Sequence, residues 1–473
     1  MNQSSNQSAL EQFKTLLGNQ HVLVSEADKA GYLVEWRDKY FGQAAAVLRP
    51  KTVQEISAIV KIANAENVAL VPQGGNTGLV GAQIAFDVDR QFVVNMSRLN
   101  TIREIDADAY TMTVDAGVVL ESAQNAANNA DRLFPLRIGS QGSCQIGGNL
   151  SSNAGGTNVV AYGNARELVL GLEVVLPNGE IINGLNKLRK NNTGYDLKNL
   201  FIGAEGTLGF ITGAVLKLFP KPRGTQAAIL AFHTLDQVGQ FFTKAKTHAG
   251  DGVTGFEVIP RIGIEFLEKH TPDVRDPLET PYPWYALVEV SSQHSYEHAE
   301  NLMMELVEEG MNEQQVSDGV LASSQAQQTA FWYLREQLSG CQKGEGGSIK
   351  TDVSVPISAL PKFLPEAIEA IKAYMPDARP CTFGHWGDGN IHLNVTQPIG
   401  MDRDGFLNHW DSISDIIHSV TLSYGGSISA EHGIGVMKRE KLSETKDPAS
   451  LALMRQIKQM LDPNGIMNPE KVL

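Results

Sequence analysis

Cysteine is scarce in this chain of 473 residues. The three cysteines are an odd number, lie far apart and do not have the spacing of metal ligands: Cys144, Cys341 and Cys381. Disulfides persist in oxidising compartments, whereas thiols in the cytosol are kept reduced. We therefore expect reduced thiols and a cytoplasmic protein.

Long apolar runs and an excess of basic charge are also absent. No stretch of roughly 18 apolar residues occurs, so we expect no transmembrane segment. The polar N-terminus lacks the basic start and the apolar stretch of a signal peptide. The formal net charge of −14 argues against a nucleic-acid partner, because phosphate backbones bind cationic surfaces.

Three regions follow one another along the chain, and we predict domains at 1–222, 223–405 and 406–473. In the first, apolar residues at helical spacing predict a helix over 54–67, and a strand follows at 68–71. The second alternates strands with amphipathic helices, which predicts an α+β sheet layered with helices. The third is mostly helical. Predicted strands of the second region are 227–232 and 284–290, and its predicted helices are 236–248, 296–309 and 358–374.

Glycine, by contrast, is abundant and clustered. Residues 72–78 (PQGGNTG) follow a predicted strand, and a polar turn of this kind can point several backbone N–H groups at one anion. Two further clusters lie at 139–156 and 203–212. None of the three clusters is a G-x-G-x-x-G, and no P-loop pattern occurs in the chain. Three such clusters predict a long ligand with phosphates, a dinucleotide whose kind the spacing leaves open.

These three segments, VPQGGNTGLVG, IGGNLSSNAGG and IGAEGTLGFIT, resemble the FAD-binding domain of the vanillyl-alcohol oxidase/p-cresol methylhydroxylase family over roughly residues 40–222. The resemblance implies a two-lobed FAD-binding domain. Residues 71–86 contain no histidine, so we expect non-covalent FAD. The resemblance places the pyrophosphate at Gly74, Gly75, Asn76, Thr77 and Gly78. It places the rest of the cofactor at Ser140, Gly142, Gly147, Gly148, Asn149, Ser152, Asn153, Gly155, Gly156 and Ile211.

A histidine pair lies in the segment GHWGDGNIHLNV, at residues 384–395. Asp-Gly is a strong signal for a two-residue hairpin loop. With Asp388 and Gly389 as the loop, His385 would face His392 across the hairpin, and both imidazoles could reach one divalent ion. Asn394 would lie on the same face. The alternative is a pair of polar hairpin histidines without a ligand.

Glu431 shifts the balance toward a metal site. It lies beside His432 in the glycine-rich SAEHGIG loop and would complete a His₂Glu set, as in catalytic zinc sites. Zn²⁺ is our first choice, and Mn²⁺ or Fe²⁺ remain open because their ligand preferences overlap. The alternative for this loop is a helix-capping turn on the surface.

Together, WxLRE (332–336), Lys350-Thr351-Asp352, GHWGDGNIHLNV and SAEHGIG resemble the D-2-hydroxyglutarate dehydrogenase branch of the FAD-linked D-2-hydroxy acid dehydrogenases. The resemblance extends to the C-terminal tail, so it covers nearly the whole chain. It implies an α+β substrate domain with an antiparallel sheet and a helical C-terminal segment that returns to the flavin. It also assigns the general base to His432, substrate binding to Arg335, Ser339, Lys350 and Asn394, and a position near the flavin to Asn468.

The expected reaction is oxidation of D-2-hydroxyglutarate to 2-oxoglutarate by hydride transfer to FAD, with a metal lowering the pKa of the hydroxyl group. D-lactate, D-malate or glycolate are alternative substrates. A non-catalytic flavin module for electron transfer is the alternative from another class. The resemblance implies an electron-transfer flavoprotein or a quinone as electron acceptor, and it is compatible with a homodimer.

Overall fold

The computed structural model describes residues 2–473 and divides into two compact units. Among the described residues, the first comprises 2–154, 164–220 and 432–473, and the second comprises 155–163 and 221–431. Helices and strands are mixed in both, and antiparallel sheets are present, which confirms the predicted fold class. The predicted three-domain division stays a prediction. In the part of the chain that is described, no helix is long and apolar enough to cross a bilayer.

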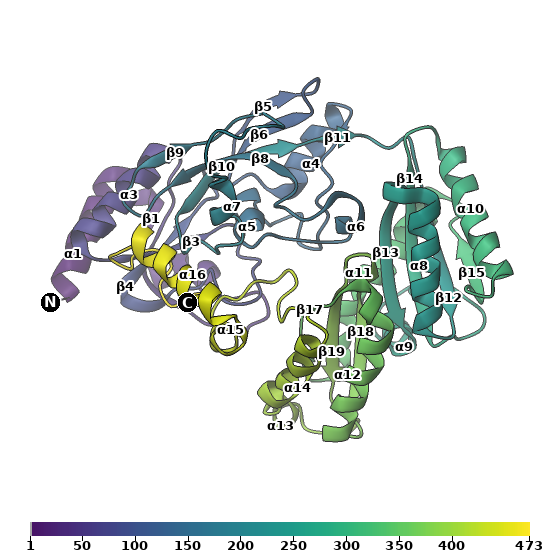
Figure 1. Cartoon of the computed structure of the whole chain (residues 1–473). Helices are drawn as coiled ribbons and strands as arrows, with labels where there is room; N and C mark the ends of the chain where they lie inside the picture. Colours follow the sequence, from purple (N-terminus) through teal and green to yellow (C-terminus); the bar gives the residue numbers. More distant parts are fainter. Residues whose placement is uncertain (1) are drawn as a thin grey trace. The chain divides into compact units, whose positions relative to one another are not determined.

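The first unit contains a four-stranded sheet in the order β1-β2-β4-β3 and a five-stranded antiparallel sheet in the order β5-β6-β10-β8-β9. Helices α1 and α3 pack side by side against the four-stranded sheet (Figure 1). The strands of this unit are β1 (Val22–Leu23), β2 (Gln43–Leu48), β3 (Ala69–Gln73), β4 (Phe86–Asn95), β5 (Ile102–Asp106), β6 (Thr111–Asp115), β7 (Arg132–Leu133), β8 (Val169–Val175), β9 (Ile181–Asn183), β10 (Phe210–Lys217) and β11 (Phe219–Pro220). Its α-helices are α1 (Asn2–Leu17), α2 (Glu26–Lys29), α3 (Val53–Glu66), α4 (Leu120–Asn129), α5 (Ile146–Ser151), α7 (Lys198–Phe201), α15 (Arg439–Thr445) and α16 (Pro448–Leu461).

Helix α3 forms where the sequence predicted it. The Thr52 side chain caps its N-terminus by accepting the N–H of Glu55, and Asn67 ends it in the left-handed conformation with φ 53°. The apolar residues at helical spacing are fully buried: Ile56, Ile59, Val60 and Ala63. Strand β3 follows at once, so this helix fixes the start of the glycine loop at 74–78.

The C-terminal tail of the chain returns to the same strand. Met467 pairs in parallel with Leu70 of β3, and the side-chain amide of Asn468 donates to the carbonyl oxygens of Glu205 and Ala82 at 2.7 and 3.0 Å. The tail therefore lies beside the strand that leads into the glycine loop.

The second unit is built on one antiparallel sheet in the order β15-β12-β14-β13-β18-β19-β16, with β17 also paired to β19. Helices α8, α10, α12 and α14 cover one face, and α9 and α11 cover the other (Figure 1). The strands are β12 (Gly224–Phe232), β13 (Val253–Pro260), β14 (Trp284–Ser292), β15 (Asp318–Leu321), β16 (Ser348–Lys350), β17 (Val353–Ser354), β18 (Arg379–His385) and β19 (Asn390–Thr396). The α-helices are α6 (Val159–Tyr162), α8 (Leu235–Ala249), α9 (Arg261–His270), α10 (Tyr296–Asn312), α11 (Gln325–Cys341), α12 (Leu360–Tyr374), α13 (Arg403–Leu407) and α14 (Trp410–Ser423).

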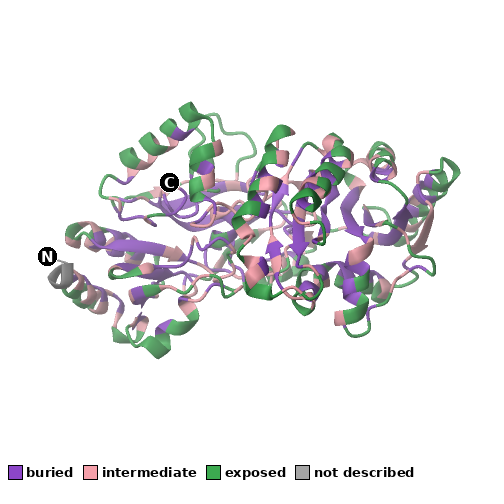
Figure 2. Cartoon of the chain, turned by 90° about the horizontal axis from the view of Figure 1, so that it is seen from below, coloured by how far each residue is buried: buried purple, intermediate pink, exposed green. Residues whose placement is uncertain are grey.

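Alternate strand residues of this sheet enter two different apolar cores. Val258 and Leu393 face α8 and α12, whereas Ile259 and Phe383 face α9 and α11. The strands are buried and the outer faces of the helices are exposed, as the purple and green of Figure 2 show. Polar side chains that point to the α9 and α11 side are therefore held within a rigid, buried layer.

A buried carboxylate also stabilises this unit. Glu345 follows α11 and contacts Lys269, His270 and Arg379, with Oε1 lying 2.6 Å from both Lys269 Nζ and His270 Nε2. Burial alone would raise the pKa of Glu345, but the hydrogen bonds from Lys269, Arg379 and His270 outweigh it and hold the pKa at about 2.

We predict that Glu345→Gln lowers the free energy of unfolding by about 2 kcal/mol at neutral pH, after a discount for the exposed Lys269. Because the folded pKa lies below the unfolded one, this stability is present above pH 4.5 and is lost as the pH falls toward 2. Urea unfolding at several pH values checks both statements. If the difference in the free energy of unfolding between wild type and variant stays constant from pH 6 to about 2, the stabilising role of ionised Glu345 is contradicted.

Candidate active site

The histidine hairpin forms, but with a longer loop than predicted. A 3₁₀ turn over Trp386–Asp388 and Gly389, with φ 84°, replace the expected two-residue loop. His385 therefore pairs with Asn390, and His392 pairs with Phe383. The predicted pairing of His385 with His392 is wrong by two residues. Because side chains alternate with a period of two, this slip leaves both imidazoles on one face.

The two imidazoles lie close together. Their ring centroids are 5.4 Å apart, which is within side-chain reach for diagonal neighbours on one sheet face. His385 Nε2 lies 3.9 Å from Glu431 Oε1, and His392 Nε2 lies 3.7 Å from the same oxygen. The three predicted metal ligands thus point their donor atoms at one another.

Asp352 fixes the position of Glu431. Its Oδ2 accepts the backbone N–H of Glu431 at 3.0 Å, and its Oδ1 accepts from the Asn390 side chain at 2.9 Å. The donor atoms of Asp352, His392 and Glu431 all lie within 4.8 Å of one another, so Asp352 is itself a candidate ligand. Burial raises the pKa of Glu431, because the charged carboxylate is held away from water.

A predicted cofactor residue lies beside this cluster. A Cβ atom added at Gly155 would lie 2.9 Å from Glu431 Oε2, so the absence of a side chain lets the chain pass close to the carboxylate. Gly155 belongs to the second glycine cluster of the sequence. Gly155, a predicted cofactor residue, and Glu431, a predicted metal ligand, are therefore neighbours within one unit.

Glu257 on β13 connects two predicted site residues. It pairs directly with His385 across the sheet, and its carboxylate contacts His385 Nδ1 at 2.6 Å and Arg335 Nε at 2.7 Å. Burial would raise the pKa of Glu257, but the charges of Arg335 and His385 hold it at about 2. Burial would lower the pKa of His385, and the carboxylate of Glu257 instead raises it to about 9.

The predicted substrate-binding residues lie on α11 and on the edge of the same sheet. Lys350 pairs with Asn394, which places it on the face of the two histidines, and its Nζ donates to the carbonyl oxygen of Ser339 at 2.8 Å. Arg335 is buried, with its guanidinium 4.9 Å from the ring centroid of Phe383. His432 is half-buried and directly follows Glu431 in the chain.

The predicted pyrophosphate loop is closely packed. A Cβ atom at Gly75 would lie 2.0 Å from the Ser143 carbonyl oxygen, so only glycine fits there. Asn76 has φ 55°, and its side chain donates to the Val34 carbonyl at 2.9 Å. Gln83 closes the loop by donating to the carbonyl oxygen of Gly78 at 2.9 Å. The loop conformation is therefore held by the protein itself.

The second glycine segment forms a turn and the short helix α5. Gly147 packs against Ala116, where a Cβ atom would lie 2.7 Å from the Ala116 Cβ, whereas a Cβ atom at Gly148 would meet no atom within 4 Å. The remaining predicted cofactor residues lie in this segment or on β10. They comprise Ser140, Gly142, Asn149, Ser152, Asn153, Gly156 and Ile211.

Buried polar atoms around this loop test whether a flavin nucleotide fits. Among the described residues, the side-chain oxygens of Gln83, Gln145 and Asn468 are buried and accept no hydrogen bond. Buried acceptors are normally satisfied, so a ligand with donor groups is expected. The imide N–H and the hydroxyl groups of FAD are donors of this type. The residues present therefore fit FAD.

We predict that Gly148→Ala lowers the affinity for FAD at least about tenfold without destabilising the protein, because alanine favours a helix by up to about 1 kcal/mol. The new methyl group enters space that the protein leaves open. FAD titration of the apoprotein and thermal unfolding check the two parts. Gly139→Ala is the matched control, since its Cβ also meets no atom within 4 Å and it is not a predicted cofactor contact. Equal FAD affinity in both variants would contradict the cradle assignment.

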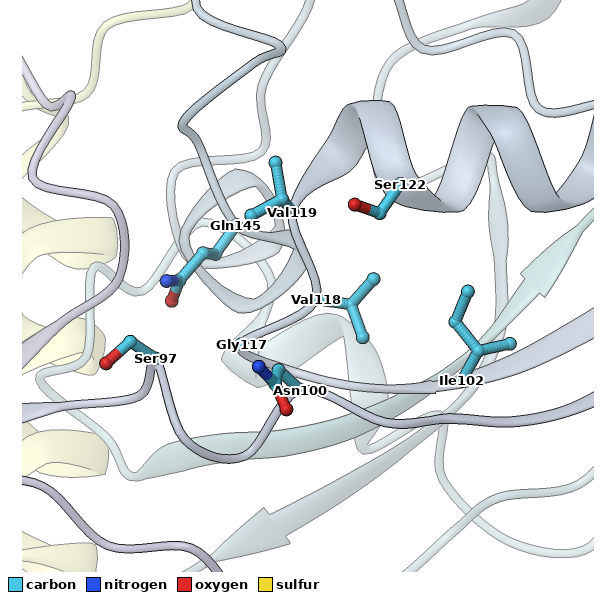
Figure 3. A pocket seen from close by; sticks show the side chains of 8 residues that line it. All are labelled: Ser97, Asn100, Ile102, Gly117, Val118, Val119, Ser122 and Gln145. Carbon is cyan, nitrogen blue, oxygen red and sulfur yellow. The ribbon is translucent and has the colours of Figure 1, made fainter.

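A separate cavity of about 210 Å³ lies in the first unit (Figure 3). It is smaller than the roughly 300–1,000 Å³ of typical ligand sites and contains none of the predicted cofactor residues. Gln145 lines it and also packs against Gly74, so the cavity lies behind the loop. Its lining residues are Ser97, Asn100, Ile102, Gly117, Val118, Val119, Ser122 and Gln145.

Sequence reasoning missed two residues of the site. Glu257 is a lone carboxylate in an otherwise apolar strand, and such a residue is almost never buried without a partner. That signal was available but did not identify the partner. Asp352 was noticed only as part of a motif, and its contact with the backbone of Glu431 depends on a pairing between distant segments.

Two family models match the chain. One is described as an FAD binding domain and matches residues 44–184, and the other is described as FAD linked oxidases, C-terminal domain, and matches residues 221–472. The crystal structure of p-cresol methylhydroxylase with substrate bound aligns with a TM-score of 0.75 at 18% identity, covering 99% of this chain and 97% of that one. This likeness shows the fold.

Curated relatives align along almost the whole chain. A D-2-hydroxyglutarate–pyruvate transhydrogenase of Saccharomyces cerevisiae is 37% identical over 98% of this chain and 94% of its own length. A mitochondrial D-2-hydroxyglutarate dehydrogenase of Arabidopsis thaliana is 35% identical, covering 98% and 80%. A mitochondrial protein of Schizosaccharomyces pombe, named a putative D-lactate dehydrogenase, is 35% identical, covering 97% and 89%.

These names correct one expectation. The prediction of a cytoplasmic protein is wrong on this comparison, because the Arabidopsis and Schizosaccharomyces relatives are named mitochondrial. The expectation rested on the number and spacing of the cysteines, and these features do not distinguish one reducing compartment from another. The FAD-binding domain, the C-terminal oxidase domain and the full-length relatives agree with one another. The chain therefore belongs to the FAD-linked oxidases and is a flavoprotein oxidoreductase of the D-2-hydroxy acid dehydrogenase type.

Proposed function

We propose that this protein oxidises D-2-hydroxyglutarate to 2-oxoglutarate with non-covalently bound FAD. The observation that carries the proposal is the convergence of the buried His385 with the half-buried His392 and Glu431 beside Gly155. Two imidazoles and one carboxylate are a typical ligand set for a catalytic zinc ion with an open position. Zn²⁺ is our first choice, with Mn²⁺ and Fe²⁺ as alternatives.

The reaction removes the C2 hydrogen as a hydride and the hydroxyl hydrogen as a proton. FAD supplies the hydride acceptor, and a divalent cation supplies charge that lowers the pKa of the substrate hydroxyl. His432 accepts the proton in this proposal, because it follows Glu431 directly and an imidazole titrates near neutral pH. The buried layer around His385 limits access of water to the reacting groups.

The distal carboxylate of the substrate requires a cation in a protein of net charge −14. In the described part of the protein, Arg335 Nη2 is buried without a hydrogen-bond partner, so this nitrogen is a donor for a carboxylate. Lys350 supplies a second cation, and Asn394 supplies an amide beside it. Ser339 contributes its carbonyl to the position of Lys350 and would offer its hydroxyl to the substrate.

A panel of D-2-hydroxy acids with an artificial dye acceptor, run before and after chelation, tests the proposal. We expect the highest kcat/KM with D-2-hydroxyglutarate, loss of activity after EDTA, and recovery with added Zn²⁺. A turnover ratio in favour of D-lactate would contradict the substrate assignment. Rates that EDTA and Zn²⁺ leave unchanged would contradict the metal assignment.

Two alternatives remain testable in the same assay. The name of the Schizosaccharomyces relative favours D-lactate as the second candidate, and D-malate and glycolate belong in the panel for the same reason. The name of the Saccharomyces relative suggests pyruvate as an electron acceptor beside the predicted electron-transfer flavoprotein or quinone. A non-catalytic flavin module would leave the flavin oxidised after anaerobic mixing with every acid. A homodimer stays a prediction.

A further inference from the structure

We propose that Glu257 is a positioning residue that sets both the metal-binding nitrogen of His385 and the carboxylate-binding nitrogen of Arg335. This inference rests on the proposed function, because it assigns a common support to the two halves of the proposed site. Glu257 lies in the middle of β13 with its side chain fully buried, and the sheet register holds it opposite His385.

The contact with His385 selects a tautomer. A carboxylate is an acceptor only, so the short distance of 2.6 Å to Nδ1 requires a proton on that nitrogen. When metal binding removes the second proton of the imidazole, the lone pair is left on Nε2, the nitrogen that lies 3.9 Å from Glu431 Oε1. Carboxylate–histidine pairs of this kind orient ligands and raise their basicity at metal sites.

The contact with Arg335 leaves the outer end of the guanidinium available. Glu257 binds the inner Nε at 2.7 Å, and the Phe383 ring supports the guanidinium at 4.9 Å. Within residues 2–473, Nη2 remains buried and without a hydrogen-bond partner. One carboxylate therefore holds the arginine by one nitrogen and presents another nitrogen of the same rigid fork.

An amide in place of this carboxylate cannot serve both contacts. Glutamine has one oxygen and one NH₂ group, so one of the two contacts must be made by a hydrogen-bond donor instead of an acceptor. If the NH₂ group faces His385, it donates to Nδ1, the proton moves to Nε2, and that nitrogen can no longer bind a metal. If the NH₂ group faces Arg335, it opposes another donor and moves the guanidinium.

The experiment compares Glu257→Gln with Glu289→Gln. Glu289 lies on the neighbouring strand β14 and is also buried. Its carboxylate accepts hydrogen bonds from the Trp332 indole at 2.7 Å and the Thr254 hydroxyl at 2.9 Å. Glu289→Gln therefore removes a buried charge outside the proposed site and controls for that loss in Glu257→Gln. The first measurement is Zn²⁺ affinity by competition with a chromophoric chelator. The second is the ratio of kcat/KM for D-2-hydroxyglutarate to that for D-lactate.

We expect Glu257→Gln to weaken Zn²⁺ binding by about 10–100-fold and to lower the substrate ratio by about tenfold, while Glu289→Gln changes each less than about threefold. Glu257→Asp should recover part of both losses, because it keeps two acceptor oxygens. Equal values for the two glutamine variants would overturn the inference. If the wild-type protein itself binds no Zn²⁺ and does not oxidise D-2-hydroxyglutarate, the proposed function is wrong. The wild-type measurements therefore distinguish a failure of the proposed function from a failure of the inference about Glu257.

Discussion

Replacing Glu431 with glutamine is expected to abolish metal retention and to lower kcat by about a thousandfold or more. The variant keeps the size of the side chain but removes the only anionic member of the proposed His₂Glu set. Two imidazoles alone leave the ion one protein ligand short of a typical catalytic site. Metal content after gel filtration and steady-state rates with D-2-hydroxyglutarate measure the two effects.

Loss of the fold would not explain this result. The Asp352 carboxylate binds the backbone N–H of Glu431, and this contact remains in the variant. Burial raises the pKa of Glu431, so the charged side chain destabilises the metal-free protein. Glutamine removes this buried charge. We therefore expect metal-free Glu431→Gln to be at least as stable toward unfolding as the metal-free wild type. Glu289→Gln is the control for a buried carboxylate in the same unit. Retention of metal at the wild-type ratio would show that Glu431 is not a ligand.

Local patterns were sufficient for most elements that support the site. The Thr52 cap and the spacing of Ile56, Ile59 and Val60 are short-range features, and α3 forms where they predict it. The Pro177–Gly179 turn, an Asn-Gly sequence typical of hairpins, is another short-range feature, and it joins β8 to β9 as an antiparallel hairpin with φ 83° at Gly179. Such features depend on neighbours in the sequence, so a single sequence is enough to find them.

The register of the histidine hairpin could not be predicted from the local sequence. Asp388-Gly389 predicted a two-residue loop, but Gly389 packs against Val355, and the chain instead closes with four residues. The register therefore depends on contacts with a segment more than thirty residues away, which the turn sequence does not encode. The shared face of His385 and His392 was nevertheless predicted, because an even slip preserves it.

The contacts of Glu257 with Arg335 and His385 could not be predicted from the sequence, because they also depend on distant segments. Glu257, Arg335 and His385 come from β13, α11 and β18, and only the sheet order brings β13 beside β18. Arg335 carried one local signal, since it lies one helical turn after Trp332 and so shares its buried face. The cause of its burial, a carboxylate on a distant strand, required the folded structure.

Lys350→Met is expected to lower kcat/KM for D-2-hydroxyglutarate by about 10–100-fold and that for D-lactate by less than about threefold. Lactate has no distal carboxylate, so an ammonium group that binds this carboxylate contributes only to the dicarboxylic substrate. Methionine preserves most of the length and the apolar stem of lysine. Parallel kinetics with both acids measure the difference.

The position of Lys350 makes this difference specific to the charge. Its strand pairs with β19 at Asn394, two residues beyond His392, so its backbone is fixed next to the proposed metal site. Its Nζ donates to the Ser339 carbonyl, which directs the ammonium group toward α11, the helix that carries Arg335. Lys372→Met on the exposed face of α12 is the control and should change neither substrate. An equal loss with both acids would indicate that Lys350 supports the fold of the site, and the second carboxylate would then depend on Arg335 alone.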